Sequence, residues 1–300
     1  MSVLPNYDSP LALKTFLQEH GMAMQKKFGQ NFMINPSIRR RLVDSLDLNE
    51  CSTVWEIGPG LGAITSDLFS RTENVLVFEI DRGFVAALKE FFRNRNSFTV
   101  VEGDVLKNWK QAVSAYGLPD RLIGNLPYNI AATIIADMIS EGERIDTMVI
   151  TVQKEVAQRM TAKPDTEHYS SFSVLCQWAY SVETITDIAA GAFWPRPNVT
   201  SRAVKMKKKT EWPCCSDTAL FQSILRGLFS SRRKTIKNNF TAWLASSTYY
   251  GNREDSENIV RNMLSGLAID PGRRAETLTV LDFCRISDKL IELYGYSGKS

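Results

Sequence analysis

The stretch GNLPYN, residues 124–129, combines groups that could hold a planar amine. It follows a short apolar run and precedes an apolar, helix-like segment, so we expect it at the exit of a strand. Asn125 offers a side-chain carbonyl, Leu126 a backbone carbonyl and Tyr128 a flat ring, while Pro127 fixes the chain locally. Two acceptors and a stacking ring suit the exocyclic amine of a nucleobase. The alternative is a plain turn, because Asn and Pro are poor inside a sheet.

Groups that could bind a nucleoside follow three earlier expected strands. EIGPGLG, residues 56–62, provides glycines, including Gly58 and Gly60, that let a ligand approach main-chain N–H groups. Glu79 ends the next strand, where a carboxylate can accept hydrogen bonds from two ribose hydroxyls. Asp104 ends the third strand. Ligands of open parallel sheets bind at the carboxyl ends of the strands, so these residues predict a nucleoside-bearing ligand.

The spacing of the glycines separates possible ligands. GxGxG differs from the GxGxxG that is typical of dinucleotide binding, and the chain has no P-loop lysine, which disfavours a triphosphate. An oxidoreductase that uses this loop for a dinucleotide is an alternative function. A second alternative function is that of a non-catalytic assembly factor that binds RNA and keeps the fold of an enzyme.

The composition excludes several classes of protein. With 44% hydrophobic and 23% charged residues, the chain can form an ordinary globular core. No apolar run approaches the roughly 20 residues that span a bilayer, and the N-terminus lacks the pattern of a secretory signal. Five cysteines without CxxC spacing favour a reducing cytoplasm over a disulfide framework. Only two histidines are present, so we expect no metal site.

Apolar β-rich runs alternate with helical stretches from residue 53 onward, which predicts an α/β fold with a mostly parallel sheet covered on both faces. The expected strands are 53–57, 75–79, 98–101, 121–124, 147–152, 182–188 and 203–207, the last two as an antiparallel pair at one edge. The expected helices of this part are 36–48, 62–70, 82–94, 109–116, 130–140 and 154–161. Residues 1–25 form a loose or helical lead-in.

The character of the chain changes near residue 209, after which residues 217–229, 232–245, 254–267 and 279–293 look helical. We therefore expect a lead-in over 1–25, a catalytic domain over 26–209 and a small all-α domain over 210–300. Residues 201–240 hold ten Lys or Arg and two acidic residues. Such an excess is either a nucleic-acid footprint or a solvated basic face.

At these motifs the chain resembles the class I S-adenosylmethionine-dependent methyltransferases, which have a Rossmann-like, seven-stranded, mostly parallel sheet. Within them it is similar to the KsgA (RsmA) family of ribosomal RNA adenine N6-dimethyltransferases. The resemblance covers nearly the whole chain from residue 26. The matching motifs are KKFGQNF (26–32), EIGPGLG (56–62), Glu79, GD (103–104), NLPYNI (125–130), QKEV (153–156), FxPxPxVxS (193–201), RRKTIKN (232–238), IDP (269–271) and RAE (274–276). One departure is Ser170, where relatives commonly have glycine.

The resemblance implies the roles of individual residues. Cofactor contacts are expected from Asn31, Met33, Gly58, Glu79, Asp104 and Asn125. Asn125, Leu126, Pro127 and Tyr128, with Phe193 as a second stacking surface, would hold the adenine in the catalytic corner. Arg232, Arg233, Lys234 and Lys237 would grip RNA phosphates; alternatively, this stretch is a helix start that packs against the first domain.

The family's activity gives the most specific expectation. It is the N6,N6-dimethylation of two adjacent adenosines in the 3′-terminal hairpin loop of small-subunit (16S) rRNA, during ribosome biogenesis in the cytoplasm. The cofactor would be S-adenosyl-L-methionine, the partner the small ribosomal subunit or its RNA, and the protein a monomer without a membrane. The alternative is a large-subunit rRNA adenine N6-methyltransferase of the antibiotic-resistance type.

Overall fold

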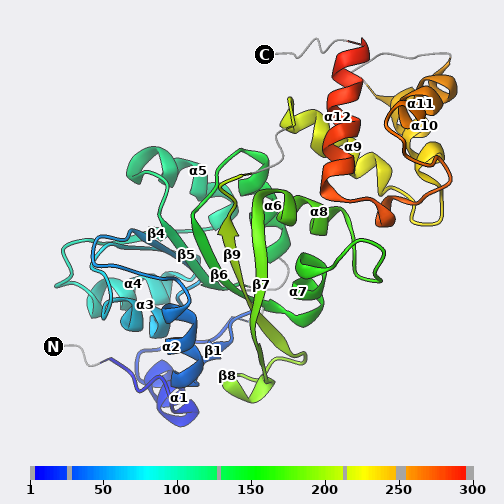
Figure 1. The fold of residues 1–300 in the computed structure, drawn as a ribbon. Helices are drawn as coiled ribbons and strands as arrows, with labels where there is room; N and C mark the ends of the chain where they lie inside the picture. The colour runs from blue at the N-terminus through cyan, green and yellow to red at the C-terminus, as the bar shows by residue number, and fades with distance from the viewer. Residues whose placement is uncertain (1–3, 26–28, 127–129, 212–214, 248–254, 295–300) are drawn as a thin grey trace. The chain divides into compact units, whose positions relative to one another are not determined.

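The computed structural model describes residues 4–25, 29–126, 130–211, 215–247 and 255–294 (Figure 1). The chain forms two compact units. The first contains residues 1–138, 143–157 and 181–208, and the second contains residues 139–142, 158–180 and 209–300. The second unit thus takes in residues 139–142 and 158–180, which precede the change of character near residue 209. No helix of the described ranges is both long and apolar enough to cross a membrane.

A seven-stranded sheet forms the first unit's centre, with the strand order β4-β3-β2-β5-β6-β9-β7. Its strands are β2 (Val54–Ile57), β3 (Val75–Glu79), β4 (Phe98–Glu102), β5 (Arg121–Asn125), β6 (Thr147–Gln153), β7 (Tyr180–Ile188) and β9 (Ser201–Lys208). The first five in the order are parallel, and β9 is antiparallel to β6. The prediction of a mostly parallel sheet is confirmed. The order reverses between β2 and β5, where open α/β sheets bind ligands.

Helices alternate with the parallel strands as the pattern predicts. Those that connect parallel strands are α3 (Ala63–Leu68), α4 (Arg82–Phe91), α5 (Val105–Tyr116) and α6 (Ala131–Ser140), while α2 (Pro36–Asp44) precedes β2 and α7 (Lys154–Thr161) follows β6. Leu42, Leu68 and Leu88 from α2, α3 and α4 share one core cluster with Val77 and Ile123 of the sheet. Strands β2 and β3 are buried along their whole length, because both faces of a parallel sheet must be covered.

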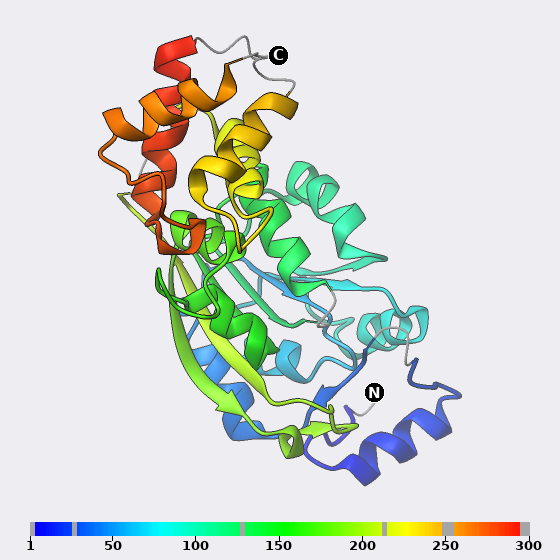
Figure 2. The ribbon, with the colours of Figure 1, turned by 90° about the vertical axis from the view of Figure 1, so that its right-hand side faces the viewer.

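The lead-in forms a helix, α1 (Pro10–Glu19), whose N-cap Ser9 accepts a hydrogen bond from the backbone of Ala12. Leu13 and Leu17 of this helix share a second core cluster with Phe32. Phe32 begins β1 (Phe32–Met33), which pairs with β8 (Phe193–Trp194) in a small antiparallel ribbon beside α1 (Figure 2). Neither two-residue strand was predicted, since two residues show no period.

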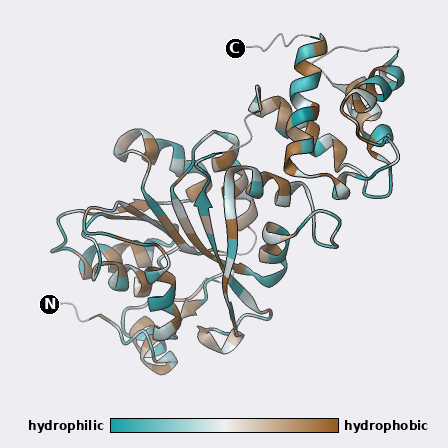
Figure 3. Cartoon of the chain, in the orientation of Figure 1, coloured by the Kyte–Doolittle hydropathy of each residue, from teal (hydrophilic) through white to brown (hydrophobic). Residues whose placement is uncertain are grey.

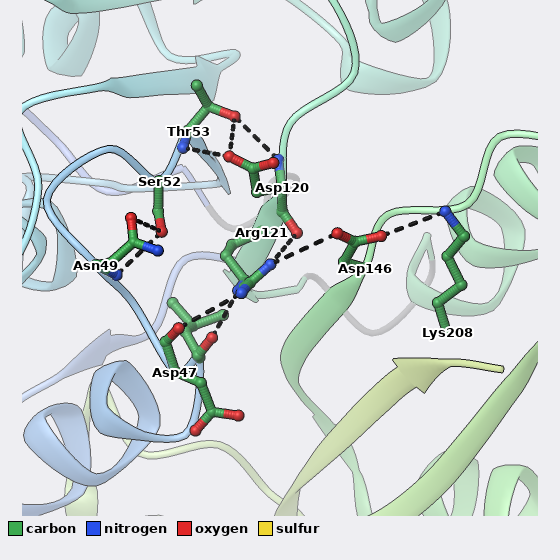
Figure 4. A network of polar contacts seen from close by, with 9 residues as sticks. Asp47, Asn49, Ser52, Thr53, Asp120, Arg121, Asp146 and Lys208 are labelled. Atoms are coloured by element: carbon green, nitrogen blue, oxygen red, sulfur yellow. Dashed lines mark hydrogen bonds and ion pairs between the residues drawn. The ribbon is translucent and has the colours of Figure 1, made fainter. Parts of the chain in front are cut away.

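The amino edge of the sheet, where the parallel strands begin, carries a dense polar network (Figure 4). Asp120 Oδ2 accepts hydrogen bonds from the Thr53 N–H and hydroxyl, each at 2.9 Å. All three nitrogens of the Arg121 guanidinium are engaged: Nε donates to the Leu46 carbonyl, Nη1 to the Asp120 carbonyl and Nη2 to the Asp47 carbonyl. This network ties the loop before β2 to the start of β5.

A second ion-pair group continues the same edge. The Asp146 carboxylate lies 4.0 Å from Nη1 of Arg121 and 3.3 Å from Nζ of Lys208 (Figure 4). Lys208 is the last residue of β9, and Asp146 directly precedes β6. The ion pair between Asp146 and Lys208 therefore links the start of β6 to the end of its antiparallel neighbour β9.

The second unit is helical. Its helices include α8 (Ser171–Ala179), α9 (Thr218–Leu228), α10 (Ile236–Ser246), α11 (Ser256–Gly266) and α12 (Val280–Tyr294), which carry both apolar and polar stretches (Figure 3). Helix α8 was not predicted. Helix α10 begins later than the predicted residue 232, because the Thr235 hydroxyl caps it by accepting from the Asn238 N–H.

Ser170, the departure from the family pattern, fits its position without strain. It is the N-cap of α8 with extended backbone angles of φ −154° and ψ 174°, which any residue can adopt. Its N–H donates to the Ser173 hydroxyl at 3.0 Å, and the two hydroxyls lie 3.2 Å apart. This capping box needs a side chain that glycine does not have.

Candidate active site

One pocket opens at the carboxyl edge of the sheet, where the strand order reverses. Its empty volume, which includes open solvent at the mouth, is about 870 Å³. All six residues predicted to contact a cofactor line it, namely Asn31, Met33, Gly58, Glu79, Asp104 and Asn125. Other residues that line it were not among the predicted contacts, and they include Gly29, Gln30, Phe32, Glu56, Val105 and Ile130. The structure thus brings segments from residues 29 to 130 to one place.

The glycine loop reaches the pocket in conformations that only glycine adopts easily. Gly58, Gly60 and Gly62 have φ angles of +71°, +58° and +87°. A Cβ atom on Gly60 would lie 2.9 Å from the Phe32 ring, and one on Gly62 would lie 2.8 Å from the Phe92 ring. Larger residues are therefore excluded by both backbone strain and collision. The loop can bring its N–H groups close to a ligand.

Glu79 stands at the end of β3 with both carboxylate oxygens held by the backbone. Oε2 accepts from the Gly60 N–H at 3.0 Å, and Oε1 accepts from the Asp81 N–H at 2.8 Å. Burial raises its pKa to about 7, against these two stabilising hydrogen bonds. Each oxygen keeps a further lone pair, so the ionised side chain can accept hydrogen bonds from a diol.

Glu56, the first residue of the EIGPGLG motif, lines the pocket although it was not among the predicted cofactor contacts. Its side chain is 1% exposed, and burial raises its pKa to about 8. The Thr65 hydroxyl donates to its Oε2 at 2.6 Å. At neutral pH the carboxyl is therefore mostly protonated, so it presents a neutral donor at the floor of the pocket. Its place directly before the glycine loop was the signal that could have found it.

Asp104 both caps helix α5 and lines the pocket. Its Oδ1 accepts from the Leu106 N–H at 3.0 Å and so caps helix α5. The preceding Gly103 donates its N–H to the Glu79 carbonyl at 2.8 Å, which fixes β4 beside β3. A cap normally explains such an aspartate alone, but here the residue also lines the pocket.

The catalytic corner that the sequence predicts begins at Asn125. Its Nδ2 donates to the Asn31 carbonyl at 2.8 Å, which leaves the side-chain Oδ1 to accept. The Leu126 N–H donates to the Thr151 carbonyl at 3.1 Å, and the Leu126 side chain is 2% exposed. The prediction for Pro127 and Tyr128 lies outside the described residues.

The lead-in contacts two segments that border the pocket, the glycine loop and β1. The Tyr7 hydroxyl donates to the Leu61 carbonyl of the glycine loop at 2.9 Å. Arg39, which is 5% exposed, donates from Nη1 to the Met33 carbonyl, from Nη2 to Asp8 and from Nε to Asp67. These contacts hold β1 against the glycine loop. The sequence did not show them, because no motif marks residues 1–25.

Phe193, the predicted second stacking surface, is buried in this structure. Its ring is 2% exposed and belongs to the core cluster that contains Met33, and it is not among the residues that line the pocket. The register of β8 explains the burial, because Phe193 is opposite Met33, and its neighbour Trp194 stacks on Phe32. Its stacking on the adenine stays a prediction.

The predicted RNA-gripping residues lie in the second unit, around the start of α10. Arg232, Arg233 and Lys234 are exposed in the turn before the helix, and Arg232 donates to the Glu167 carbonyl at 2.9 Å. Lys237 forms an ion pair with Glu257 at 3.0 Å. The described residues contain no group of His, Cys, Asp or Glu side chains suited to hold a metal ion.

The chain is similar to known proteins along most of its length. The family model for ribosomal RNA adenine dimethylase matches residues 21–290. "Ribosomal RNA small subunit methyltransferase A" of Treponema denticola is 46% identical over 286 residues, which cover 95% of each chain. The protein of the same name from Borrelia garinii is 37% identical over 290 residues, 97% of each chain.

Solved structures agree on the fold. A dimethyladenosine transferase from Plasmodium falciparum has a TM-score of 0.71 at 24% identity, covering 84% of this chain and 94% of its own. The 23S rRNA methyltransferase ErmE has a TM-score of 0.61 at 20% identity, covering 85% of this chain and 98% of its own.

Proposed function

The chain belongs to the ribosomal RNA adenine dimethylase family and is a methyltransferase, and from this premise we propose its substrate and chemistry. It transfers methyl groups from S-adenosylmethionine to the N6 atoms of two adjacent adenosines in the 3′-terminal hairpin loop of small-subunit rRNA. The partner is the small ribosomal subunit or its RNA, which implies work in the cytoplasm, and the enzyme acts as a monomer.

The observation that carries the proposal is the position of Asn125. Its side chain lines the same pocket as Glu79 and the glycine loop, although 46 residues separate it from Glu79 in the sequence. A nucleoside-bearing donor and an adenine amine would therefore meet at this residue.

The pocket residues fit S-adenosylmethionine. Glu79, fixed by two backbone N–H groups, would accept hydrogen bonds from the ribose hydroxyls. Asp104 at the neighbouring strand end would face the adenine amine of the cofactor, and the glycine loop leaves room for its amino-acid part. Asn31 and Met33 would contact it from the wall formed by β1. When bound, the cofactor supplies a methyl group on a sulfonium, which is a strong electrophile.

The residues of the corner would prepare the nucleophile. The lone pair of adenine N6 is delocalised into the ring, so the amine must be made pyramidal before it can attack. Hydrogen bonds from its two N–H groups to the Asn125 Oδ1 and the Leu126 carbonyl would favour that shape. Tyr128 would stack on the ring and hold it in line. The target adenine must leave its stack to reach this corner.

The same corner can act twice on one adenine. After the first transfer, N6 keeps one proton and can still donate one hydrogen bond to the corner. After the second it has none. The Arg232, Arg233, Lys234 and Lys237 side chains would meanwhile hold the phosphates of the RNA.

Mass-spectrometric mapping of N6,N6-dimethyladenosine tests the proposal. Undermethylated small subunits and large-subunit RNA are incubated separately with the protein and isotopically labelled cofactor. We expect two adjacent labelled adenines in the small-subunit hairpin loop. Label in the large-subunit RNA alone would support the antibiotic-resistance type of enzyme instead.

Calorimetry tests the cofactor independently of the RNA. S-adenosylhomocysteine is expected to bind, and NAD is not. Tight NAD binding without a response to S-adenosylhomocysteine would support an oxidoreductase.

A further inference from the structure

A cluster of three charges lies on the edge of the sheet beside the catalytic corner. The Asp187 carboxylate of β7 receives the Arg202 Nε at 2.5 Å and the Lys154 Nζ at 2.8 Å. The hydrogen bond from Arg202, and then that from Lys154, hold the pKa of Asp187 well below its usual range. With two cations and one anion, this cluster carries a net charge of +1.

The strand register places the cluster relative to Asn125. Asn125 is opposite Thr151 of β6, and Thr151 is opposite Ala203 of β9. Arg202 is the next residue toward the carboxyl edge, and Lys154 directly follows β6. Two strand spacings put the backbone of Arg202 roughly 10 Å from that of Asn125. Both cations therefore belong to the carboxyl edge of the sheet, the edge at which Asn125 ends β5.

Arg202 has donors to offer a ligand. Only its Nε is engaged, and within the described part of the chain no partner is seen for its Nη1 or Nη2. Arg121 at the amino edge and Arg39 behind the pocket each have all three nitrogens engaged. A guanidinium whose terminal nitrogens face no protein acceptor presents a fork suited to phosphate oxygens.

We propose that Arg202 and Lys154 form a subsite for RNA phosphate next to the methylated adenine. This inference rests on the proposed function and deepens it. The Arg202 fork, on a side chain that is 18% exposed, binds two oxygens of one phosphodiester, and Lys154, whose side chain is 41% exposed, supplies a second positive charge. Asp187 holds both side chains at the edge. The subsite would fix the backbone of the extruded nucleotide while Asn125 holds its base.

Salt dependence of RNA binding tests this subsite. A fluorescently labelled RNA hairpin with the 3′-terminal small-subunit sequence is titrated with full-length protein at several KCl concentrations. Each phosphate contact contributes roughly 0.7 to 0.9 to the slope of log K against log salt. We expect Arg202→Gln to lower the slope by about that amount and to weaken binding severalfold.

Lys208→Gln is the matched control. It removes the same charge from the same strand, and it breaks a similar ion pair with Asp146, but at the amino edge. The net charge of the two variants is equal, so non-specific attraction falls equally. We expect the Lys208 variant to keep the slope of the wild type.

Two further variants sharpen the test. Arg202→Lys keeps the charge but loses the fork, so we expect an unchanged slope with weaker binding. Asp187→Asn keeps an acceptor for the Arg202 Nε but removes a negative charge, so we expect tighter binding. Thermal unfolding and calorimetric binding of S-adenosylhomocysteine verify that each variant is folded.

The outcomes separate this inference from the proposed function. Equal slopes for Arg202→Gln and Lys208→Gln, or unchanged binding by Asp187→Asn, would overturn the subsite while the wild type still methylates the RNA. Failure of the wild type to methylate small-subunit RNA would instead overturn the proposed function.

Discussion

The two edges of the same sheet use their polar residues in opposite ways. At the amino edge, Arg121 has every guanidinium nitrogen engaged, and Asp120 Oδ2 receives two hydrogen bonds from Thr53. At the carboxyl edge, Glu56 and Glu79 are buried with raised pKa values, and they line an open pocket.

The contrast between the two edges separates polar groups that stabilise the fold from polar groups that act on a ligand. A residue whose hydrogen-bonding groups are all engaged by the protein contributes to the stability of the fold. A buried acid with a raised pKa lowers that stability at neutral and alkaline pH, and this cost indicates another use. We expect substitutions at the amino edge to change stability and substitutions at the carboxyl edge to change chemistry.

The largest effect is expected at Asn125. Asn125→Ala removes an acceptor for the adenine amine, so we expect turnover to fall by about 10²–10³-fold, as for other polar groups that act on the reacting centre. Single-turnover methyl transfer measures it. Asn49→Ala at the amino edge is the control, since it loses hydrogen bonds to Cys51 and Ser52 but should keep normal turnover.

Arg121→Ala should show the reverse pattern. The side chain is 17% exposed, and its loss would leave the Leu46, Asp47 and Asp120 carbonyls without their donors. We expect a loss of about 2–3 kcal/mol of unfolding free energy and unchanged turnover per folded molecule. Denaturant titration and active-site counting measure the two quantities. A loss of turnover without a loss of stability would contradict the stabilising role of the amino edge.

Glu56→Gln should stabilise the protein at high pH. The folded-state pKa of about 8 is above the ordinary value of 4.5, so the folded state holds the extra proton between these values. Stability therefore falls as pH rises through this window. Glutamine mimics the protonated acid, and we expect the variant to lose less stability between pH 5 and pH 8, roughly 3 kcal/mol less. Thermal unfolding across this range gives the answer, and parallel curves for the variant and the wild type would contradict it.

Glu79 should make cofactor binding depend on pH. The ionised carboxylate accepts hydrogen bonds from the ribose, and its pKa is about 7, so the affinity should weaken as the pH falls through 7. At pH 8, Glu79→Gln should bind S-adenosylhomocysteine about tenfold more weakly, because a charged acceptor is replaced by a neutral one. Its affinity should also vary less with pH. Calorimetry from pH 6 to pH 8.5 measures both.

The smallest effect is expected for Lys208→Ala. Its ion pair with Asp146 is exposed, with 39% of the Lys208 side chain and 58% of the Asp146 side chain accessible. Exposed pairs contribute at most about 1 kcal/mol, so we expect a loss within that limit and unchanged methyl transfer. A larger loss would show that the amino-edge network acts as one unit.

The sequence predicted the sheet well because its strands have strong local signals. Strand β3 was predicted at its observed bounds, and the end of β2 at Ile57 placed the glycine loop correctly. Parallel strands end at one edge, so the order of motifs sufficed to bring Glu79, Asp104 and Asn125 together.

The parts that were missed depend on contacts between distant segments. β1 and β8 are two residues each and exist only because Phe32 pairs with Trp194. The wall held by Arg39 needs Asp8 and Asp67, which no spacing rule connects. Phe193 was assigned to the base from the FxPxPxVxS pattern of the family, and only the register of β8 shows that its ring is buried.

The hydrogen bond from the Asn125 amide to the Asn31 carbonyl closes a loop of 94 residues. The direction of the Asn125 amide is therefore fixed by a backbone carbonyl from a segment far earlier in the chain. Displacement of that segment would turn the acceptor of the methyl-accepting corner away, even with every strand of the central sheet in place.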